Sequence, residues 1–196
     1  ILQSDLSIGI NLSKLEVLKS NQGISSVGIQ LNGTGFVVDN EQALRLGLNG
    51  IAAKRIRPLR NGRDIAQANR QVYLIDIDDL ELNEIRREYP EIYQWLLEHV
   101  KPERDQNADA TFRKFWWKFG RTRPELRQSI KDIDRYILTP ITAKHRFFIF
   151  EPTSVFIDST SVAIAIEDAY SLGILSSDIH ARWALRAGTR LGVGND

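Results

Sequence analysis

The sequence predicts an α/β (α+β) fold, with a helical portion around residues 79–130 followed by a small mixed β-sheet around 132–166. Apolar residues recur at helical spacing over 78–99, and short β-branched and aromatic runs recur over 135–166. The chain has 196 residues, of which 42% are hydrophobic and 26% are charged. It is therefore long enough to bury one core and has the composition of a globular protein.

Individual elements have their own signals. Asp39 precedes an acid and two leucines that end at Gly47, which predicts a short capped helix. The β-branched and aromatic run Val72–Ile77 predicts a buried strand, and Pro90 is placed to begin the second of two helices in 78–99. The other predictions are brief strands or loops through Gly35, short strands at 135–139, 145–150, 154–157 and 162–166, and two closing helices over 168–188 broken at Ser176 and Ser177.

Several features of the whole chain exclude classes of protein. It opens Ile1-Leu-Gln-Ser-Asp5 with neither an initiator methionine nor a signal peptide, so we expect a piece of a longer protein. Cysteine is absent, which excludes disulfides, thiolate zinc sites and cysteine nucleophiles, and we expect a cytoplasmic protein. No apolar run is long enough to span a membrane, so no membrane partner is expected. The net charge is only +1, and any affinity for nucleic acid must come from the distribution of charge.

Motifs for catalysis are missing from the sequence. There is no glycine-rich turn for a methyl donor, no Asn/Asp-Pro-Pro-aromatic loop for an adenine amine, and no P-loop. The histidines are far apart and lack the spacing of a zinc site or a triad: His99, His145 and His180. We therefore predict no catalytic residue, no metal site and no cofactor in this chain.

A cluster of carboxylates leaves one enzymatic alternative open. Asp76, Asp78 and Asp79 have the ligand chemistry for Mg²⁺ in a metal-dependent nuclease. No lysine follows at close spacing, however, and a solvated acidic loop explains them equally well.

The densest basic run extends from Lys54 to Arg63 and contains no acid. Arginine pairs with phosphate or guanine edges and asparagine pairs with adenine, so this Gly-containing loop is a candidate DNA-facing group. The alternative is a solvated basic loop, or one neutralised by the acids at 76–91. The candidate DNA-binding residues are Arg57, Arg60, Asn61 and Arg63.

Basic and aromatic residues are interleaved over 101–127. The adjacent Trp116 and Trp117 could stack on bases, but packing in the core is the favoured interpretation. Lys144-His145-Arg146 lies at the mouth of a predicted strand, where it either projects into a groove or forms a charged turn. His180 and Trp183 are best explained by packing in the core. These segments add Lys101, Arg104, Arg121, Arg123, Lys144 and Arg146 to the candidate DNA-binding residues.

Eight motifs follow one another in a characteristic order. They are Ile56-Arg-Pro-Leu-Arg-Asn-Gly-Arg-Asp64, Tyr73-Leu-Ile-Asp76, Tyr89-Pro90 with Tyr93, Val100-Lys-Pro-Glu-Arg104, Phe115-Trp-Trp117 with Phe119-Gly120 and Arg123, Arg135-Tyr-Ile137, Lys144-His-Arg146, and Leu172-Gly-Ile-Leu-Ser-Ser177 with His180 and Trp183. In this order the chain resembles the C-terminal half of type IIG-like adenine-specific DNA methyltransferases, which are associated with restriction and phage defence. The similarity extends from about residue 1 to the end.

This resemblance implies a target-recognition domain that closes over double-stranded DNA. The parent enzyme would transfer a methyl group from S-adenosylmethionine to the exocyclic amine of adenine, using an upstream Rossmann-like domain that is missing here. The resemblance also matches Arg57, Asn61, Arg63, Arg121, Lys144 and Arg146 to positions of the family. We expect one domain over 1–196, with possible lobes at 1–78 and 79–196, that binds the upstream methyltransferase domain. The alternatives are a protein-interaction or scaffolding module and, less favoured, the nuclease.

Overall fold

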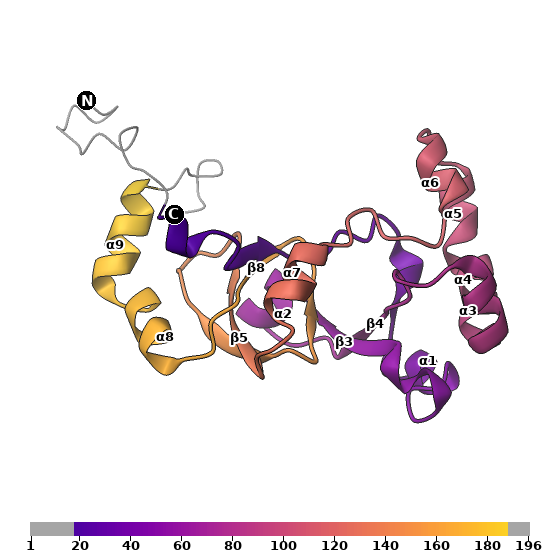
Figure 1. Cartoon of the computed structure of the whole chain (residues 1–196), viewed down its shortest axis with the longest axis horizontal. Coiled ribbons are helices and arrows are strands. Elements are labelled where there is room, and N and C mark those ends of the chain that lie inside the picture. Colours follow the sequence, from indigo (N-terminus) through magenta and orange to yellow (C-terminus); the bar gives the residue numbers. More distant parts are fainter. Residues whose placement is uncertain (1–17, 188–196) are drawn as a thin grey trace.

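The structure is a computed structural model that describes residues 18–187. It is elongated, with two small sheets in the middle, helices α3 to α6 at one end and helices α8 and α9 at the other (Figure 1). The parts of the predicted domain at 1–17 and 188–196 lie outside the described residues.

The first sheet is antiparallel throughout. It has the order β1-β8-β5-β6, and β8 lies between β1 and β5. Its strands are β1 (Ser25–Val27), β5 (Arg135–Pro140), β6 (Ile149–Pro152) and β8 (Ser161–Ile164).

The second sheet is mixed. It has the order β2-β4-β3-β7, and the pairing of β3 with β7 is parallel while the other two pairings are antiparallel. Its strands are β2 (Val37–Val38), β3 (Ile56–Arg60), β4 (Val72–Ile75) and β7 (Phe156–Ile157). Both sheets combine strands from the two predicted lobes, so a division at residue 78 does not coincide with a division between sheets.

Gly28 and Ile29 connect the two sheets at the end of β1. The Gly28 N–H donates to Ser161 O over 3.0 Å, and the Ile29 N–H donates to Ile157 O over 2.9 Å. A Cβ atom at position 28 would lie 2.2 Å from Asp158 O, a distance that no side chain can tolerate. The junction therefore requires glycine for the close approach of two backbones.

The helices are short and begin at recognisable caps. Asp39 and Asn61 each form a capping box with the residue three positions on, and Pro90 and Pro124 occupy first turns. The helices are α1 (Asn40–Arg45), α2 (Gly62–Ala66), α3 (Leu82–Glu88), α4 (Pro90–His99), α5 (Lys101–Asp105), α6 (Ala110–Lys114), α7 (Pro124–Ser129), α8 (Ala169–Leu175) and α9 (Asp178–Ala187). The 3₁₀ turns lie at Lys19–Asn21, Thr34–Phe36 and Ile51–Lys54.

Two apolar clusters stabilise this arrangement. The larger one joins the second sheet to α1, α3 and α4, and it includes Trp116, Trp117 and Phe119. The smaller one is formed by Leu126, Tyr136, Leu138, Ile157 and Ala163, between the first sheet and α7.

The predicted fold class is confirmed, because the described residues form many short helices and small sheets without a Rossmann-like domain. The predicted helices at 39–47, in 78–99 and over 168–188 are also present, with the final break at the two serines. The predicted small sheet differs in one respect: the strands of 132–166 do not form one sheet, since β7 pairs with β3 instead. None of the helices in residues 18–187 is long and apolar enough to cross a membrane.

Candidate nucleic-acid interface

The basic run 54–63 is not the DNA-facing loop that was predicted from the sequence. Residues 56–60 form β3, a central strand of the mixed sheet, because Ile56 and Leu59 are buried in the larger cluster. Arg57 and Arg60 are consequently half-buried beside neighbouring elements, and the cavity described below is lined by residues that follow β3.

Arg57 is held by contacts within the chain. Its Nη2 donates to Thr153 O over 2.7 Å and its Nε to Ser154 O over 3.3 Å. Its guanidinium lies 4.4 Å from the centre of the Phe156 ring, and its Nη1 lies 4.0 Å from Asp76 Oδ2. Burial lowers the pKa of Arg57, against the opposing effect of Asp76. The side chain therefore connects β3 to the turn before β7.

Arg60 likewise has an internal partner. Its Nε lies 2.9 Å from Oε1 of Glu151, a buried carboxylate on β6. Burial raises the pKa of Glu151, while the ion pair with Arg60 opposes that rise. Arg60 thus neutralises a carboxylate that the sheets enclose.

Helix α2 begins directly after β3 and is fixed by its cap. Asn61 Oδ1 accepts from the N–H groups of Arg63 and Asp64 at 2.9 and 3.0 Å, and Asp64 returns the bond by accepting from Asn61 N. Two bonds of 2.8 and 2.9 Å join the buried Asp64 to the Arg70 guanidinium. Burial alone raises the pKa of Asp64, but the bonds from Arg70 and Asn61 prevail and lower it to about 2. Asn61 therefore caps α2, and its predicted contact with DNA stays a prediction.

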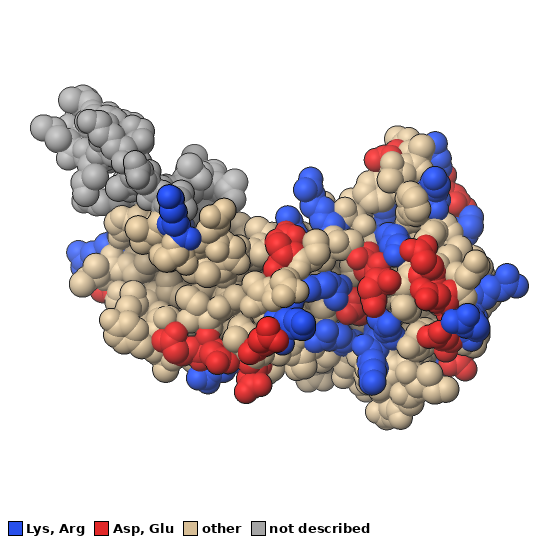
Figure 2. All heavy atoms as spheres, viewed as in Figure 1, with Lys and Arg blue, Asp and Glu red and all other residues tan. Residues whose placement is uncertain are grey.

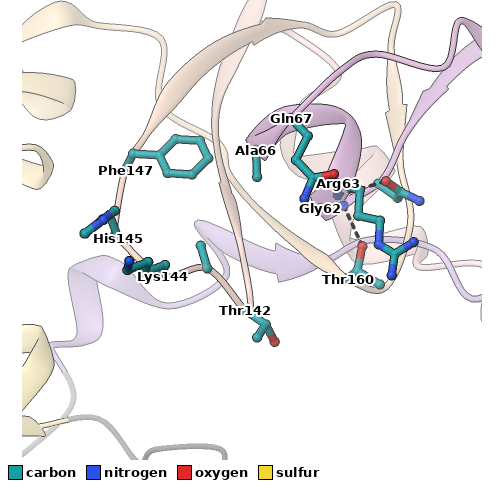
Figure 3. Close-up of a pocket in the computed structure, with 11 residues that line it drawn as sticks. Gly62, Arg63, Ala66, Gln67, Thr142, Lys144, His145, Phe147 and Thr160 are labelled. Carbon is teal, nitrogen blue, oxygen red and sulfur yellow. Dashed lines mark hydrogen bonds between the residues drawn. The ribbon is translucent and has the colours of Figure 1, made fainter. Parts of the chain in front are cut away.

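A cavity of about 790 Å³ lies between α2 and the β5–β6 loop, residues 141–148. Figure 3 shows α2 on one wall and the loop on the other, with Phe147 pointing across toward Ala66 and the Gln67 amide in the same space. The lining residues are Asn61, Gly62, Arg63, Ala66, Gln67, Thr142, Ala143, Lys144, His145, Phe147 and Thr160. Two motifs far apart in the sequence thus meet at one site.

The cavity is positively charged. Arg63 and Lys144 line it from opposite walls together with His145, and none of its lining residues within the described chain is acidic. Neither Arg63 nor Lys144 forms a side-chain hydrogen bond or ion pair with another described residue. The Gly62 N–H donates to Thr160 Oγ1 over 2.7 Å, which ties α2 to the turn before β8. This arrangement suits an anionic ligand.

The candidates at the helical end do not join this site. Lys101 pairs with Asp105 on the surface of α5. Arg104 is only 1% exposed, donates to Leu31 O and Lys118 O at 2.9 Å each, and lies 4.6 Å from the centre of the Phe112 ring. Burial lowers the pKa of Arg104. Because its guanidinium is enclosed, Arg104 organises the junction of α5 with the 31–33 segment and is unavailable to DNA in this structure.

The remaining candidates lie outside the cavity lining. Arg121 forms a backbone bridge with Gln30 and keeps an exposed side chain, and Arg146 is exposed beside Lys144 on the same loop. Arg123 has a left-handed backbone (φ 52°) at the start of α7, and its Nη1 lies 3.5 Å from Glu125. These three stay predictions as DNA contacts.

The acidic stretch after β4 also has structural partners. Asp76 accepts two bonds of 2.8 and 3.0 Å from Arg127, and Asp78 accepts from Phe119 N over 2.9 Å. Asp79 pairs with Arg55 at 2.7 Å. Within residues 18–187 there is no group of three or more His, Cys, Asp or Glu side chains that could hold a metal ion.

The aromatic predictions have different outcomes. Trp116 and Trp117 are buried, so the favoured interpretation as core residues is confirmed. His180 stacks near Trp183 with ring centres 6.2 Å apart, but Trp183 is 55% exposed, so the predicted packing in a core is wrong for that residue. The closing helices α8 and α9 instead present apolar side chains at the surface.

Gln67, Phe147 and Thr160 could not be identified from the sequence as parts of the site. Gln67 ends α2, Phe147 follows the Lys144–Arg146 motif, and Thr160 lies on the turn before β8. The one signal available in the sequence was that each basic motif lies next to a short helix or strand. Residues adjacent to such a motif then lie on the same surface as the motif.

Charge is distributed unevenly over the face seen in Figure 2. Basic and acidic side chains are intermixed over the half that carries α3 to α6, whereas much of the half that carries β5 and α8 is uncharged in this view. In the helical half, opposite charges lie close together, as in the ion pairs Arg87–Glu88 and Lys101–Asp105.

Comparisons with known proteins identify a similar fold. Neither a protein family nor a curated protein sequence matches the chain. A solved structure of the type IIL restriction-modification enzyme MmeI in complex with DNA does match, with a TM-score of 0.67 at 20% sequence identity. The chain shares the fold of one part of MmeI. The match covers 85% of this chain and 22% of the MmeI chain, so the chain spans about a fifth of that enzyme.

Proposed function

We propose that this chain is the DNA-recognition part of a restriction-modification enzyme and that it binds double-stranded DNA through the face that contains the α2 cavity. The observation that carries the proposal is the meeting of Arg63 and Lys144 across that cavity, without an acidic residue among its described lining. Cations with no internal partner are available to phosphate oxygens, whereas Arg57, Arg60 and Arg104 are engaged within the chain. The fold shared with part of a DNA-bound restriction-modification enzyme supports the same conclusion.

The finer identity belongs to this proposal as well. The ordered motifs resemble type IIG-like adenine-specific methyltransferases, while MmeI is a type IIL enzyme. We propose a parent that transfers a methyl group from S-adenosylmethionine to adenine in an upstream domain. The present chain would position the duplex against that domain, hold no cofactor and perform no chemistry itself.

The proposal is tested by fluorescence anisotropy with short random-sequence duplexes at about 50 and 200 mM salt, across which phosphate-dominated binding weakens steeply. We expect Arg63→Ala and Lys144→Ala each to reduce duplex affinity and to lower the salt slope by about one unit. Arg86→Ala is the matched control, since it removes from α3, at the helical end, one exposed positive charge that has no side-chain partner among the described residues. Equal weakening by all three variants would show a general charge effect and contradict the proposed interface.

A protein-interaction role is a second candidate, and the exposed apolar residues of the closing helices favour it. Tyr170 is 79% exposed and Ile179 is 83% exposed, together with the half-exposed Trp183. In the aromatic-basic segment, Trp116 and Trp117 are buried and unavailable for such a contact, while Phe115 is 40% exposed. Size-exclusion chromatography with light scattering tests self-association, which Ile179→Glu should abolish if α8 and α9 form the contact.

A further inference from the structure

The shape of the α2 cavity restricts which part of a DNA molecule can enter it. The site is a hollow of about 790 Å³, within the roughly 300–1,000 Å³ typical of ligand pockets. A base pair stacked inside a duplex exposes only its edges in the grooves, so a hollow on the protein cannot enclose it. A backbone segment, or a nucleotide whose base has left the stack, can enter.

The walls of the cavity match both parts of a nucleotide. The Phe147 ring points across the cavity toward Ala66, so both walls contribute apolar surface to it (Figure 3). The amide of Gln67 projects into the same space and offers both donors and an acceptor to a base edge. Aromatic rings stack on any base, and amides pair with base edges. Arg63 and Lys144 line the same hollow and suit a phosphate.

Both walls are held in place before any ligand binds. The Thr139 hydroxyl donates to Phe147 O over 2.9 Å, which fixes the backbone at the aromatic residue. On the opposite side, the Asn61 capping box and the Gly62–Thr160 bond fix α2. A preformed site avoids much of the entropic cost of ordering its side chains on binding.

We propose that the cavity receives one unstacked nucleotide of the bound DNA. The base lies against Phe147 with its edge at Gln67, and the adjoining phosphate lies between Arg63 and Lys144. This inference rests on the proposed DNA binding and adds a preference for DNA in which one base is free of the stack.

The experiment compares three probes by anisotropy with the 196-residue chain: a perfect duplex, the same duplex with one bulged adenine, and the same bulge without its base. We expect the bulged duplex to bind about tenfold more tightly than the perfect duplex, because base–aromatic stacking adds to the backbone contacts. The probe that lacks the base should lose this gain, which separates stacking from the flexibility of the bulge.

Two variants assign the preference to the cavity. Phe147→Leu and Gln67→Leu should each reduce the ratio of the affinities for the bulged and the perfect duplex. Gln67 is exposed, so its substitution is compatible with folding. Phe115→Leu is the matched control, since it removes an exposed aromatic ring at the end of α6, outside the cavity. Equal affinity for all three probes, or an undiminished preference in both cavity variants, overturns the inference and leaves duplex binding intact. Failure to bind any probe overturns the proposed function too.

Discussion

Arg60 and Arg63 are three residues apart yet belong to different environments. Arg60 ends β3 and pairs at 2.9 Å with Glu151, which the sheets bury. Arg63 lies in the first turn of the helix that follows, exposed in the cavity and without a described side-chain partner. The same residue type therefore stabilises the fold in the strand and is available to a ligand on the helix. Local charge density does not distinguish the two roles, whereas the position of an acidic partner does.

Among variants that test this division between structural and ligand-accessible cations, Arg104→Ala should have the largest effect. Substitution by alanine removes two hydrogen bonds and the packing against Phe112. It leaves the Lys118 carbonyl without its donor, while the Leu31 carbonyl keeps the bond from the Gly120 N–H. We expect Arg104→Ala to lower the free energy of unfolding by about 3 kcal/mol. Chemical denaturation measures this loss, and Lys101→Ala on the same helix is the control with little effect. A wild-type midpoint in Arg104→Ala would contradict a structural role.

Arg60→Ala should be the next most damaging change, because it leaves the Glu151 carboxylate buried without its partner. We expect a loss of about 2 kcal/mol in the free energy of unfolding, with the duplex affinity of the folded protein unchanged. Replacing both partners in Arg60→Ala with Glu151→Gln should recover part of the loss. If Arg60→Ala weakened DNA binding but left stability intact, the assignment of the two arginines would have to be reversed.

The double variant Arg63→Ala with Lys144→Ala should show the opposite pattern, with weaker duplex binding and unchanged stability. With both cavity cations removed, we expect duplex affinity to fall by about a hundredfold, as roughly 1.4 kcal/mol for each contact implies. The melting temperature should remain within about a degree of the wild-type value, because exposed residues without partners contribute little to stability. Parallel anisotropy and thermal melts on one preparation separate the two effects.

The smallest expected effect concerns pH. The pKa of Asp64 is lowered from its ordinary 3.8 to about 2, so its charged form is favoured by folding. This contribution is fully present above about pH 4 and is lost as the pH falls toward 2. Because Arg70 is half-exposed, we expect only about 1 kcal/mol from the pair. The difference in the free energy of unfolding between wild type and Asp64→Asn should therefore be smaller at pH 2.5 than at pH 6. An equal difference at both pH values would exclude this origin of the stabilisation.

Much of the local structure could be predicted from short-range signals. Asp39 and Pro90 mark helix starts through the geometry of their own backbone and side chains, and the apolar run Val72–Ile75 forms a strand in which Leu74 and Ile75 are buried. The strand at 56–60 could not be predicted from the sequence, because Arg57, Pro58 and Arg60 interrupt its apolar residues. A central strand with proline and arginine becomes acceptable only where partners from β6 and β7 neutralise or cover the side chains.

By itself the sequence determined the fold class, the capped helices and the ordered motifs, because these depend on spacing and backbone preference within a few residues. Tertiary structure decided which cations are free. Carbonyls and a carboxylate from distant segments bind the side chains of Arg57, Arg60 and Arg104. Arg63 has no such partner and lies in the cavity that α2 and the β5–β6 loop form together. Such pairings join residues tens of positions apart, and no local pattern specifies which partners folding will bring together.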